Sequence, residues 1–507
     1  MTEAKAATSG EKNRRVIKNI AANLLYELVV VAFGLILPRL YLLNFGSDVN
    51  GLDNTIKNIF AYLALLEAGV GLSAQYALYR PVAEGDTKGI NSILSATRIF
   101  YLKTGVIYLL ASLFFAAVYP LIIKTELSYF TVFMVILIYS IPGVILFLLR
   151  GKYTVFLDVE GKRYILTVLS MITLIISNVL RLVLLMFFDN LILVQATYCV
   201  PSVIQIIAVE IYVKRKYPWI NFKEKPDFHA LSQKKSVLIH QISGCIFSNT
   251  DTIIISVVCG MSRASVYAIY ALFFSNFQKI VNSFTNSMTF KFGQLYQIDK
   301  EKFRRDFGTY ETVYYTLMFA AYTVITAFLA PVIKLYTEGV ADAAIYNSAF
   351  VLVAFAVSTV VGAAETPQIQ LLSIAGKFDD TKNQAVWEMC INIAVSVPAT
   401  VILGIPGCLL GTVAALVYRT NALMRYSSAN IVGERVILSY KKLFVNILAG
   451  VVILCITGVG GCEPIGYIYI MGRAILSALW ILPCFIMVNL VTSFNDFKWL
   501  YKSLKKN

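Results

Sequence analysis

Long apolar runs alternate with short polar connections along the chain from about residue 20 onward. Most runs reach the roughly 17–25 residues that a helix needs to cross a hydrocarbon core about 30 Å thick. We therefore predict an all-α polytopic membrane protein with about fourteen transmembrane helices. The predicted spans are 20–43, 56–79, 101–123, 129–149, 164–187, 190–213, 237–258, 264–289, 310–333, 346–366, 385–403, 407–426, 440–457 and 468–493.

Positive charges gather on alternate connections between these runs. Counting residues at the adjoining helix ends, 37 of the 44 Lys and Arg residues lie there or in the two tails. Because Lys and Arg accumulate in cytoplasmic loops, both termini are predicted to be cytoplasmic. The net charge of +15 is thus first a topology signal, and attraction to anionic lipids follows from it. No basic domain offers a nucleic-acid surface, so we expect no nucleic-acid partner.

Composition and spacing argue for a transporter and against an enzyme. Hydrophobic residues make up 58% of the chain and charged residues 14%. The longest connection, 214–236, leaves no room for a soluble catalytic domain. The sequence contains no GxxxxGK[ST] phosphate loop and no HExxH or CxxC spacing for a metal. We therefore expect a membrane transporter with neither a cofactor nor a metal centre.

Two basic stretches divide the predicted spans into six, six and two. Because six is even, the two six-helix halves start from the same side of the membrane and form parallel repeats with pseudo-twofold symmetry. The predicted parts are a cytoplasmic tail (1–19), an N-lobe (20–213), a basic cytoplasmic linker (214–236), a C-lobe (237–426), two accessory helices (427–493) and a second cytoplasmic tail (494–507).

A series of short strings gives the chain a likeness to a known superfamily. They are Leu37-Pro38-Arg39, Phe45-Gly46, Glu67-Ala68-Gly69-Val70-Gly71, Leu78-Tyr79-Arg80-Pro81, Tyr217-Pro218-Trp219, Ile239-His240-Gln241-Ile242, Asn249-Thr250-Asp251, Gly376-Lys377-Phe378, Ile391-Asn392-Ile393, Gly411-Thr412 and Tyr418-Arg419-Thr420. In this order, and with the six-six-two division, they resemble the multidrug/oligosaccharidyl-lipid/polysaccharide (MOP) flippase superfamily. Within it the chain is similar to the polysaccharide (O-antigen type) branch, over essentially its whole length.

The resemblance implies a flippase of the bacterial cell (inner) membrane. Such a protein moves undecaprenyl-diphosphate-linked oligosaccharide from the inner to the outer leaflet during polysaccharide biosynthesis, by alternating access of two lobes. Its partners would be this lipid-linked oligosaccharide, membrane lipids, a polysaccharide polymerase and glycosyltransferases. The two accessory helices would help to form an apolar groove for the lipid tail. A cation-coupled multidrug (MATE-type) exporter and a lipid-linked peptidoglycan precursor flippase stay open as alternatives.

Polar residues inside the predicted spans mark a candidate substrate path. A charge near the bilayer centre costs at least ~2.5–3.5 kcal/mol, so such a side chain usually faces a cavity or a partner. In the first span Asn23 and Glu27 lie on one helix face, and Arg39 lies near its outer end. In the fifth span Ser177 and Arg181 share a face. Arg181 is a candidate ligand for a pyrophosphate or an acidic sugar, and the alternative is that it extends to the outer headgroups.

The seventh span adds Gln241, Asn249 and Asp251 to this candidate path. Asp251 lies near the predicted midplane, and the resemblance implies that it faces the central cavity. Glu27 and Asp251 are the candidates for coupling transport to an H+ or Na+ gradient, and the other interpretation is that each pairs with a basic neighbour. We assign a following group of aromatic residues to the core or to the lipid-facing surface. This group contains Tyr267, Tyr270, Phe273, Phe274 and Phe277.

Overall fold

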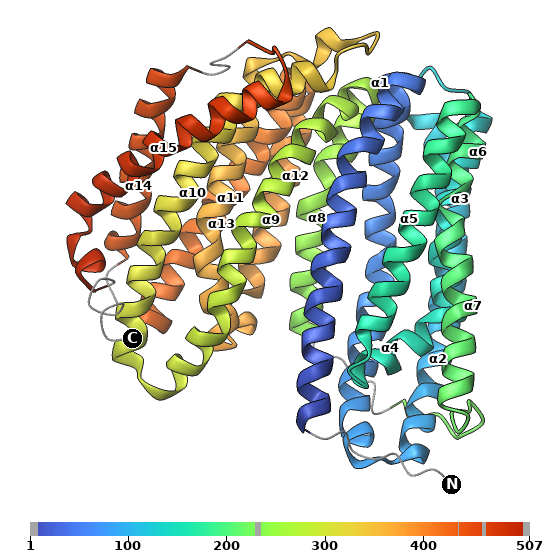
Figure 1. Ribbon diagram of the computed structural model, residues 1–507. Helices are drawn as coiled ribbons and strands as arrows, with labels where there is room; N and C mark the ends of the chain where they lie inside the picture. The colour runs from blue at the N-terminus through green and yellow to red at the C-terminus, as the bar shows by residue number, and fades with distance from the viewer. Residues whose placement is uncertain (1–8, 229–234, 434–435, 459–462, 500–507) are drawn as a thin grey trace. The chain divides into compact units, whose positions relative to one another are not determined.

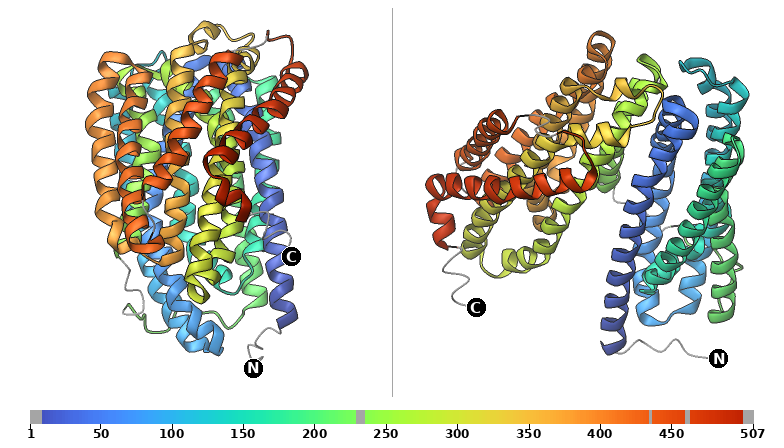
Figure 2. Two further views of the ribbon diagram at one scale, coloured as in Figure 1. Left: turned by 90° about the vertical axis from the view of Figure 1, so that its left-hand side faces the viewer. Right: turned by 45° about the horizontal axis from the view of Figure 1, so that its top comes forward.

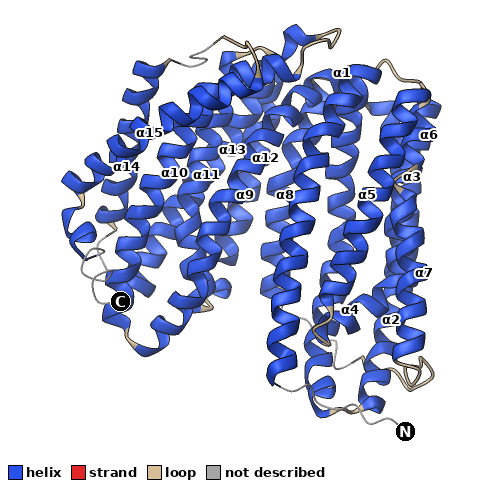
Figure 3. Ribbon diagram, in the orientation of Figure 1, coloured by secondary structure: helices blue, strands red, loops and turns tan. Residues whose placement is uncertain are grey.

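The computed structural model describes residues 9–228, 235–433, 436–458 and 463–499. Throughout this part of the chain the regular structure is helical, without a strand (Figure 3). Eleven of the described helices are long and apolar enough to cross a membrane. The prediction of an all-α polytopic membrane protein is confirmed.

Eleven membrane-crossing helices are fewer than the fourteen predicted spans, and three long helices explain the difference. α1 (Ser9–Glu84) runs through both the first and the second predicted span. α8 (Lys235–Val258) and α9 (Met261–Ile298) occupy the seventh and the eighth. The described helices therefore cover all fourteen predicted spans, and eleven helices meet the length and hydropathy of a membrane crossing.

The chain forms two compact units, and the division falls within α8. Unit 1 comprises Met1–Asn249 and Gly260–Ser262, and unit 2 comprises Thr250–Cys259 and Arg263–Asn507. In unit 1, α1 is followed by α2 (Thr87–Ile122), α3 (Tyr129–Ile145), a π-helical turn (Leu146–Arg150), α4 (Gly151–Val159), α5 (Arg163–Phe187), α6 (Leu191–Ala196) and α7 (Cys199–Lys216) (Figure 1). In unit 2, α9 is followed by α10 (Lys300–Tyr336), a 3-10 turn (Ala343–Tyr346), α11 (Ala349–Ala375), α12 (Phe378–Leu403), α13 (Ile405–Ser427), a π-helical turn (Ser428–Val432), α14 (Ile437–Thr457) and α15 (Tyr467–Thr492).

A single glycine interrupts α1 between the first two predicted spans. Gly46 has φ 78° and ψ −176°, and the chain is helical on both sides of it. A positive φ is strained for residues that carry a Cβ atom, whereas glycine adopts it freely. The sequence suggests a polar loop at this place, but the structure has two helical segments joined at Gly46.

Gly46→Ala is expected to lower the free energy of unfolding by about 1–3 kcal/mol, because φ 78° with ψ −176° is a backbone region that essentially only glycine adopts. No atom lies within 4 Å of the added Cβ, so the cost comes from the backbone alone. Gly34→Ala is the matched control, because Gly34 is helical in the same helix and equally uncrowded. Thermal unfolding in detergent measures both variants, and an equal loss in the two would contradict the assignment of strain to Gly46.

The segment after α7 packs onto the end of unit 1. Trp219 and Phe222 contact the buried cluster formed by residues of α2, α4 and α7. Asn91 of α2 donates a side-chain hydrogen bond to the Trp219 carbonyl at 3.1 Å. Arg98 and Lys152 both lie over the Phe222 ring, at 5.5 and 4.8 Å from its centroid, and burial together with Arg98 lowers the pKa of Lys152. This part of the predicted basic linker is therefore a structured cap.

The two accessory helices pack against α10 within unit 2 (Figure 2). Asn446 of α14 and Asn489 of α15 are fully buried and exchange two side-chain hydrogen bonds, of 3.0 and 2.8 Å. Buried polar groups need such partners because leaving them unpaired is costly. The amide pair therefore fixes α14 and α15 to each other.

Candidate functional site

A buried polar cluster surrounds Asp251 in unit 2. The Asp251 side chain is 3% exposed, and its Oδ2 accepts hydrogen bonds from the Thr412 hydroxyl at 2.6 Å and the Tyr267 hydroxyl at 3.2 Å. The Thr412 oxygen accepts a further hydrogen bond from Asn392 Nδ2 at 3.1 Å. The cluster thus joins the end of α8 to α9, α12 and α13.

Within the described part of the chain, two buried oxygens of this cluster have no hydrogen-bond partner, Oδ1 of Asp251 and Oδ1 of Asn392. The partners of the Asp251 carboxylate are hydroxyl groups, which stabilise its charge without neutralising it. Burying a carboxylate without a counter-charge costs several kcal/mol, on the order of the penalties found for buried ions. Oxygen-rich sites of this kind hold hard cations or a proton. The cluster is therefore a candidate site for Na+ or H+.

Close packing of α12 on α13 holds this cluster together. A Cβ atom at Gly411 would lie 2.1 Å from Ser396 Oγ, so only glycine allows the approach. Ser396 Oγ also donates to the Cys408 carbonyl at 3.0 Å. Small residues at helix interfaces let two backbones come near each other. This approach places Asn392 on α12 within hydrogen-bond distance of Thr412 on α13.

A second buried polar cluster lies in unit 1 and contains Arg181, which is 3% exposed. Its Nε donates to Thr197 Oγ1 at 2.9 Å, and its guanidinium carbon lies 3.8 Å from the centroid of the Tyr198 ring. The Tyr198 hydroxyl donates to Asp53 at 3.3 Å, and Asp53 also pairs with Lys57 at 2.6 Å. Arg181 is therefore buried inside unit 1, next to Tyr198, whose hydroxyl donates to the Asp53 carboxylate.

Ser177 belongs to the same cluster as Arg181. It lies one turn earlier on α5, and its hydroxyl donates to the Thr197 carbonyl at 2.7 Å. Asn249 makes a more local contact, donating to the Cys245 carbonyl of its own helix at 2.7 Å. The structure thus groups two of the predicted path residues and leaves Asn249 apart from them.

The other predicted path residues are less buried. The side chains of Glu27 and Gln241 are exposed, and that of Arg39 is partly buried. The side chain of Asn23 lies outside the described part of the structure. The assignment of these residues to the substrate path stays a prediction.

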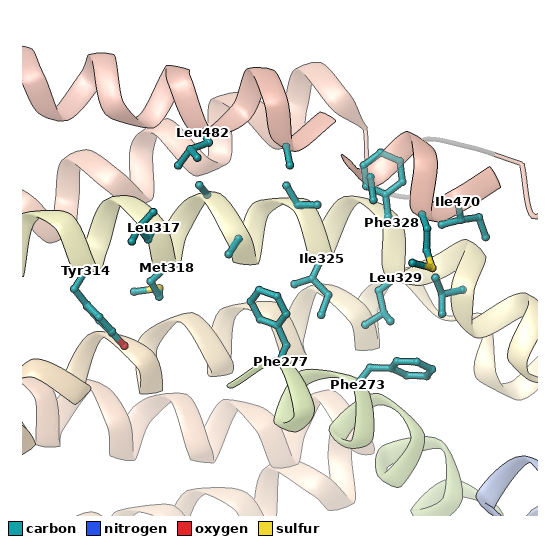
Figure 4. Close-up of a pocket in the computed structure, with 17 residues that line it drawn as sticks. Phe273, Phe277, Tyr314, Leu317, Met318, Ile325, Phe328, Leu329, Ile470 and Leu482 are labelled. Atoms are coloured by element: carbon teal, nitrogen blue, oxygen red, sulfur yellow. The ribbon is translucent and has the colours of Figure 1, made fainter. Parts of the chain in front are cut away.

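An apolar cavity of about 620 Å³ lies between α9, α10 and α15 in unit 2 (Figure 4). Among its described lining residues only Tyr314 carries a hydroxyl, and this group donates to the Ala363 carbonyl at 2.8 Å. The cavity therefore offers hydrocarbon surface and no free hydrogen-bonding group. Its labelled lining residues are Phe273, Phe277, Tyr314, Leu317, Met318, Ile325, Phe328, Leu329, Ile470 and Leu482.

A buried network of ion pairs joins α14 to α10, one of the helices that line the cavity. Lys442 Nζ lies 3.4 Å from Glu311 Oε2 and 3.0 Å from Asp496 Oδ2. Gln368 of α11 donates to the other oxygen of Glu311 at 3.1 Å. The network connects the accessory helix α14 and the segment after α15 to the body of unit 2.

The sequence alone does not identify several of these residues as site residues. Asn392 lies inside the predicted span 385–403, and Thr412 lies inside the span 407–426. The sequence signal that marks Asn392 is a polar residue within an apolar run. Nothing in the local pattern indicates that Asn392 and Thr412 meet Asp251.

No protein-family profile and no curated protein sequence matches this chain. Solved structures do match it. The chain is similar to a lipid II flippase MurJ in the inward closed conformation, with a TM-score of 0.69 and 13% identity, over 94% of this chain and 100% of that one. It is also similar to an inward-facing multidrug resistance MATE family transporter of the MOP superfamily, with a TM-score of 0.59 and 13% identity, over 80% and 94% of the two chains.

A MOP superfamily transporter from Pyrococcus furiosus is a third similar structure, with a TM-score of 0.52 and 13% identity, over 84% of this chain and 99% of that one. The chain therefore shares the fold of these flippase and transporter structures, and it is a multi-pass membrane protein. At these identities the likeness concerns the fold. The polysaccharide branch indicated by the sequence stays a prediction.

Proposed function

We propose that the protein is a flippase that moves undecaprenyl-diphosphate-linked oligosaccharide from the inner to the outer leaflet of a bacterial cell membrane. Both termini lie in the cytoplasm in this proposal, as the charge distribution predicts. A gradient of Na+ or H+ drives the cycle through the cluster at Asp251. Polysaccharide polymerase and glycosyltransferases are the partners that would consume and supply such a substrate.

The observation that carries the proposal is the apolar cavity between α9, α10 and α15. A lipid tail gains about 0.8 kcal/mol for each methylene group that it buries in such a surface. One wall is formed by α15, which belongs to the predicted accessory pair. MATE-type exporters normally have twelve spans and carry no lipid tail, so an accessory helix that lines a hydrocarbon cavity favours a lipid-linked substrate.

Ala474→Trp is expected to weaken the binding of the lipid-linked oligosaccharide about tenfold or more, because losing the burial of two methylene groups costs about 1.6 kcal/mol. Ala474 of α15 lines the cavity. Leu476→Trp is the matched control on the same helix, since Leu476 is 62% exposed, and its affinity should stay within about twofold of the wild type. Binding is measured by native mass spectrometry or by fluorescence titration in nanodiscs.

Equal affinities of the two tryptophan variants would contradict the assignment of the cavity to the lipid tail. A soluble oligosaccharide diphosphate without the tail provides the second arm and should bind both variants alike. A lipid-linked peptidoglycan precursor is the second candidate substrate, because it shares the polyprenyl diphosphate and differs in its headgroup. Comparing the two headgroups on one tail distinguishes these substrates.

A further inference from the structure

Glu365, Glu388 and Arg419 meet inside unit 2 from three neighbouring helices, α11, α12 and α13. Arg419 Nε lies 3.6 Å from Glu365 Oε1 and 3.7 Å from Glu388 Oε2. The three side chains are 6%, 12% and 6% exposed for Glu365, Glu388 and Arg419. None of the three belongs to the cluster around Asp251. We refer to them as the Glu–Arg–Glu trio.

The trio carries one guanidinium group for two carboxylates. With both carboxylates ionised it would hold an uncompensated negative charge in the interior, which is strongly unfavourable. Two carboxylates that share one site also oppose each other's ionisation. Protonation of either carboxylate restores neutrality, and no other bond forms or breaks.

Arg419 makes no close contact with either carboxylate of the trio. Both nitrogen–oxygen distances exceed the range of a hydrogen bond. Arg419 Nε and Nη1 are buried and have no hydrogen-bond partner among the described residues. A locked ion pair would instead have short, bidentate contacts between the guanidinium fork and one carboxylate. The guanidinium is nearly equidistant from the two acids, as expected if either of them can be the ionised one.

Neighbouring titratable groups on α10 have other partners. Glu311 pairs with Lys442 and accepts a hydrogen bond from Gln368 of α11. Tyr314 and Tyr315 donate to carbonyl groups of α11, at 2.8 and 3.1 Å. Among the described residues, these groups of α10 therefore add no counter-charge to the trio.

The trio lies about 15 Å from the turn that joins α11 to α12, at 1.5 Å per helical residue. Glu365 precedes the end of α11 by ten residues, and Glu388 follows the start of α12 by ten. The other acids of α12, Asp379 and Asp380, lie in its first turn. The charge distribution predicts that this turn is cytoplasmic, so we assign the exchange of a proton to that side.

We propose that Glu365 and Glu388 share one exchangeable proton, so that the Glu–Arg–Glu trio is a proton-binding site through which cytoplasmic pH acts on unit 2. The site is distinct from the candidate cation site at Asp251. The proposal concerns the protonation of the trio and holds whatever the substrate is, so its failure and the failure of the proposed function are separable.

Infrared titration of the full-length protein in nanodiscs tests the proposal through the carbonyl band of protonated carboxyl groups. The wild type should show one protonated buried carboxyl that titrates with pH. Glu365→Gln and Glu388→Gln should each lose it, because the remaining carboxylate then pairs with Arg419 as a neutral couple. Arg419→Lys keeps the positive charge and should keep the band.

Asp251→Asn is the control for the buried carboxylate of the candidate cation site. The pH-dependent change that Glu388→Gln removes must persist in this variant. Identical spectra for the wild type and both glutamine variants would overturn the proposal, since the trio would then hold two ionised acids. Retention of the band in either glutamine variant alone would overturn it as well, because the proton would then not be shared.

Discussion

Asp251→Asn is expected to abolish the binding of the coupling cation and, with it, cation-driven transport. The substitution keeps the size of the side chain and removes the only charge among the hydrogen-bonded groups Asp251, Thr412, Tyr267 and Asn392. Loss of this charge should lower cation affinity by about 100-fold or more, since even indirect changes around a metal site cost 10–100-fold.

Thermal unfolding with Na+ replaced by choline at constant ionic strength measures this binding. A ligand at 100 times its dissociation constant stabilises the folded state by about 2.7 kcal/mol. The wild type should therefore unfold at a higher temperature in Na+, and Asp251→Asn should show no difference between the salts. A variant that kept the full sodium effect would contradict the assignment of the site.

Substitutions of Thr412 supply the matched pair of controls. Thr412→Ser keeps the hydroxyl that donates to Asp251 and should keep the cation effect. Thr412→Val has nearly the same shape but no oxygen, and should lower the affinity about tenfold. If the coupling ion is H+, the same contrast between variants appears in the pH dependence of unfolding instead of the sodium dependence.

Lys442→Met is expected to lower the free energy of unfolding by about 3–5 kcal/mol, the usual cost of breaking a buried ion pair from one side. It leaves Glu311, whose side chain is 5% exposed, without its cationic partner, and it also removes the contact to Asp496. The accessory helix α14 should then detach from α10 more easily. Thermal unfolding together with limited proteolysis of the segment after α15 measures both effects.

Lys441→Met is the control for this substitution, because the neighbouring lysine is exposed and bonds only to the Thr492 carbonyl among its described contacts. It should change the unfolding free energy by no more than about 0.5 kcal/mol. The double variant Lys442→Met with Glu311→Gln should recover most of the loss, since both charges are then absent. Equal stabilities of the two lysine variants would show that the network does not fix α14.

The helices and the all-α polytopic fold were predictable because their signal is local and repeated. Each apolar run predicts one crossing, and the distribution of Lys and Arg residues predicts the side of each connection. The kink at Gly46 was harder to predict from the sequence, because the residues around it are polar enough to indicate a loop and yet are helical. Only the φ of that residue distinguishes the two conformations.

The candidate site was predictable only in part. Depth within a span identified Asp251 and Arg181, because a charge inside an apolar run stands out from its neighbours. Their surroundings did not follow, since Asp251 and Thr412 are 161 residues apart and meet through packing of α13. The partners of Arg181 likewise include Tyr198, which has no distinctive sequence context.

The same limit explains the Glu–Arg–Glu trio and the apolar cavity. Arg419 lies near the end of a predicted span, where a positive charge is ordinary and points to topology rather than to a buried cluster. Phe273 and Phe277 look like core or lipid-facing residues, and the structure places both along the cavity. Helical periodicity cannot distinguish a packed core from the wall of a cavity.

Leaflet transfer in proteoliposomes tests the central claim most directly. Fluorescent undecaprenyl-diphosphate-linked oligosaccharide is placed in one leaflet, and its appearance in the other is followed by quenching, with an imposed Na+ or H+ gradient. We predict protein-dependent transfer that the gradient accelerates and that Asp251→Asn and Ala474→Trp reduce. Absence of transfer for every lipid-diphosphate oligosaccharide, together with export of cationic dyes from the same vesicles, would contradict the flippase function.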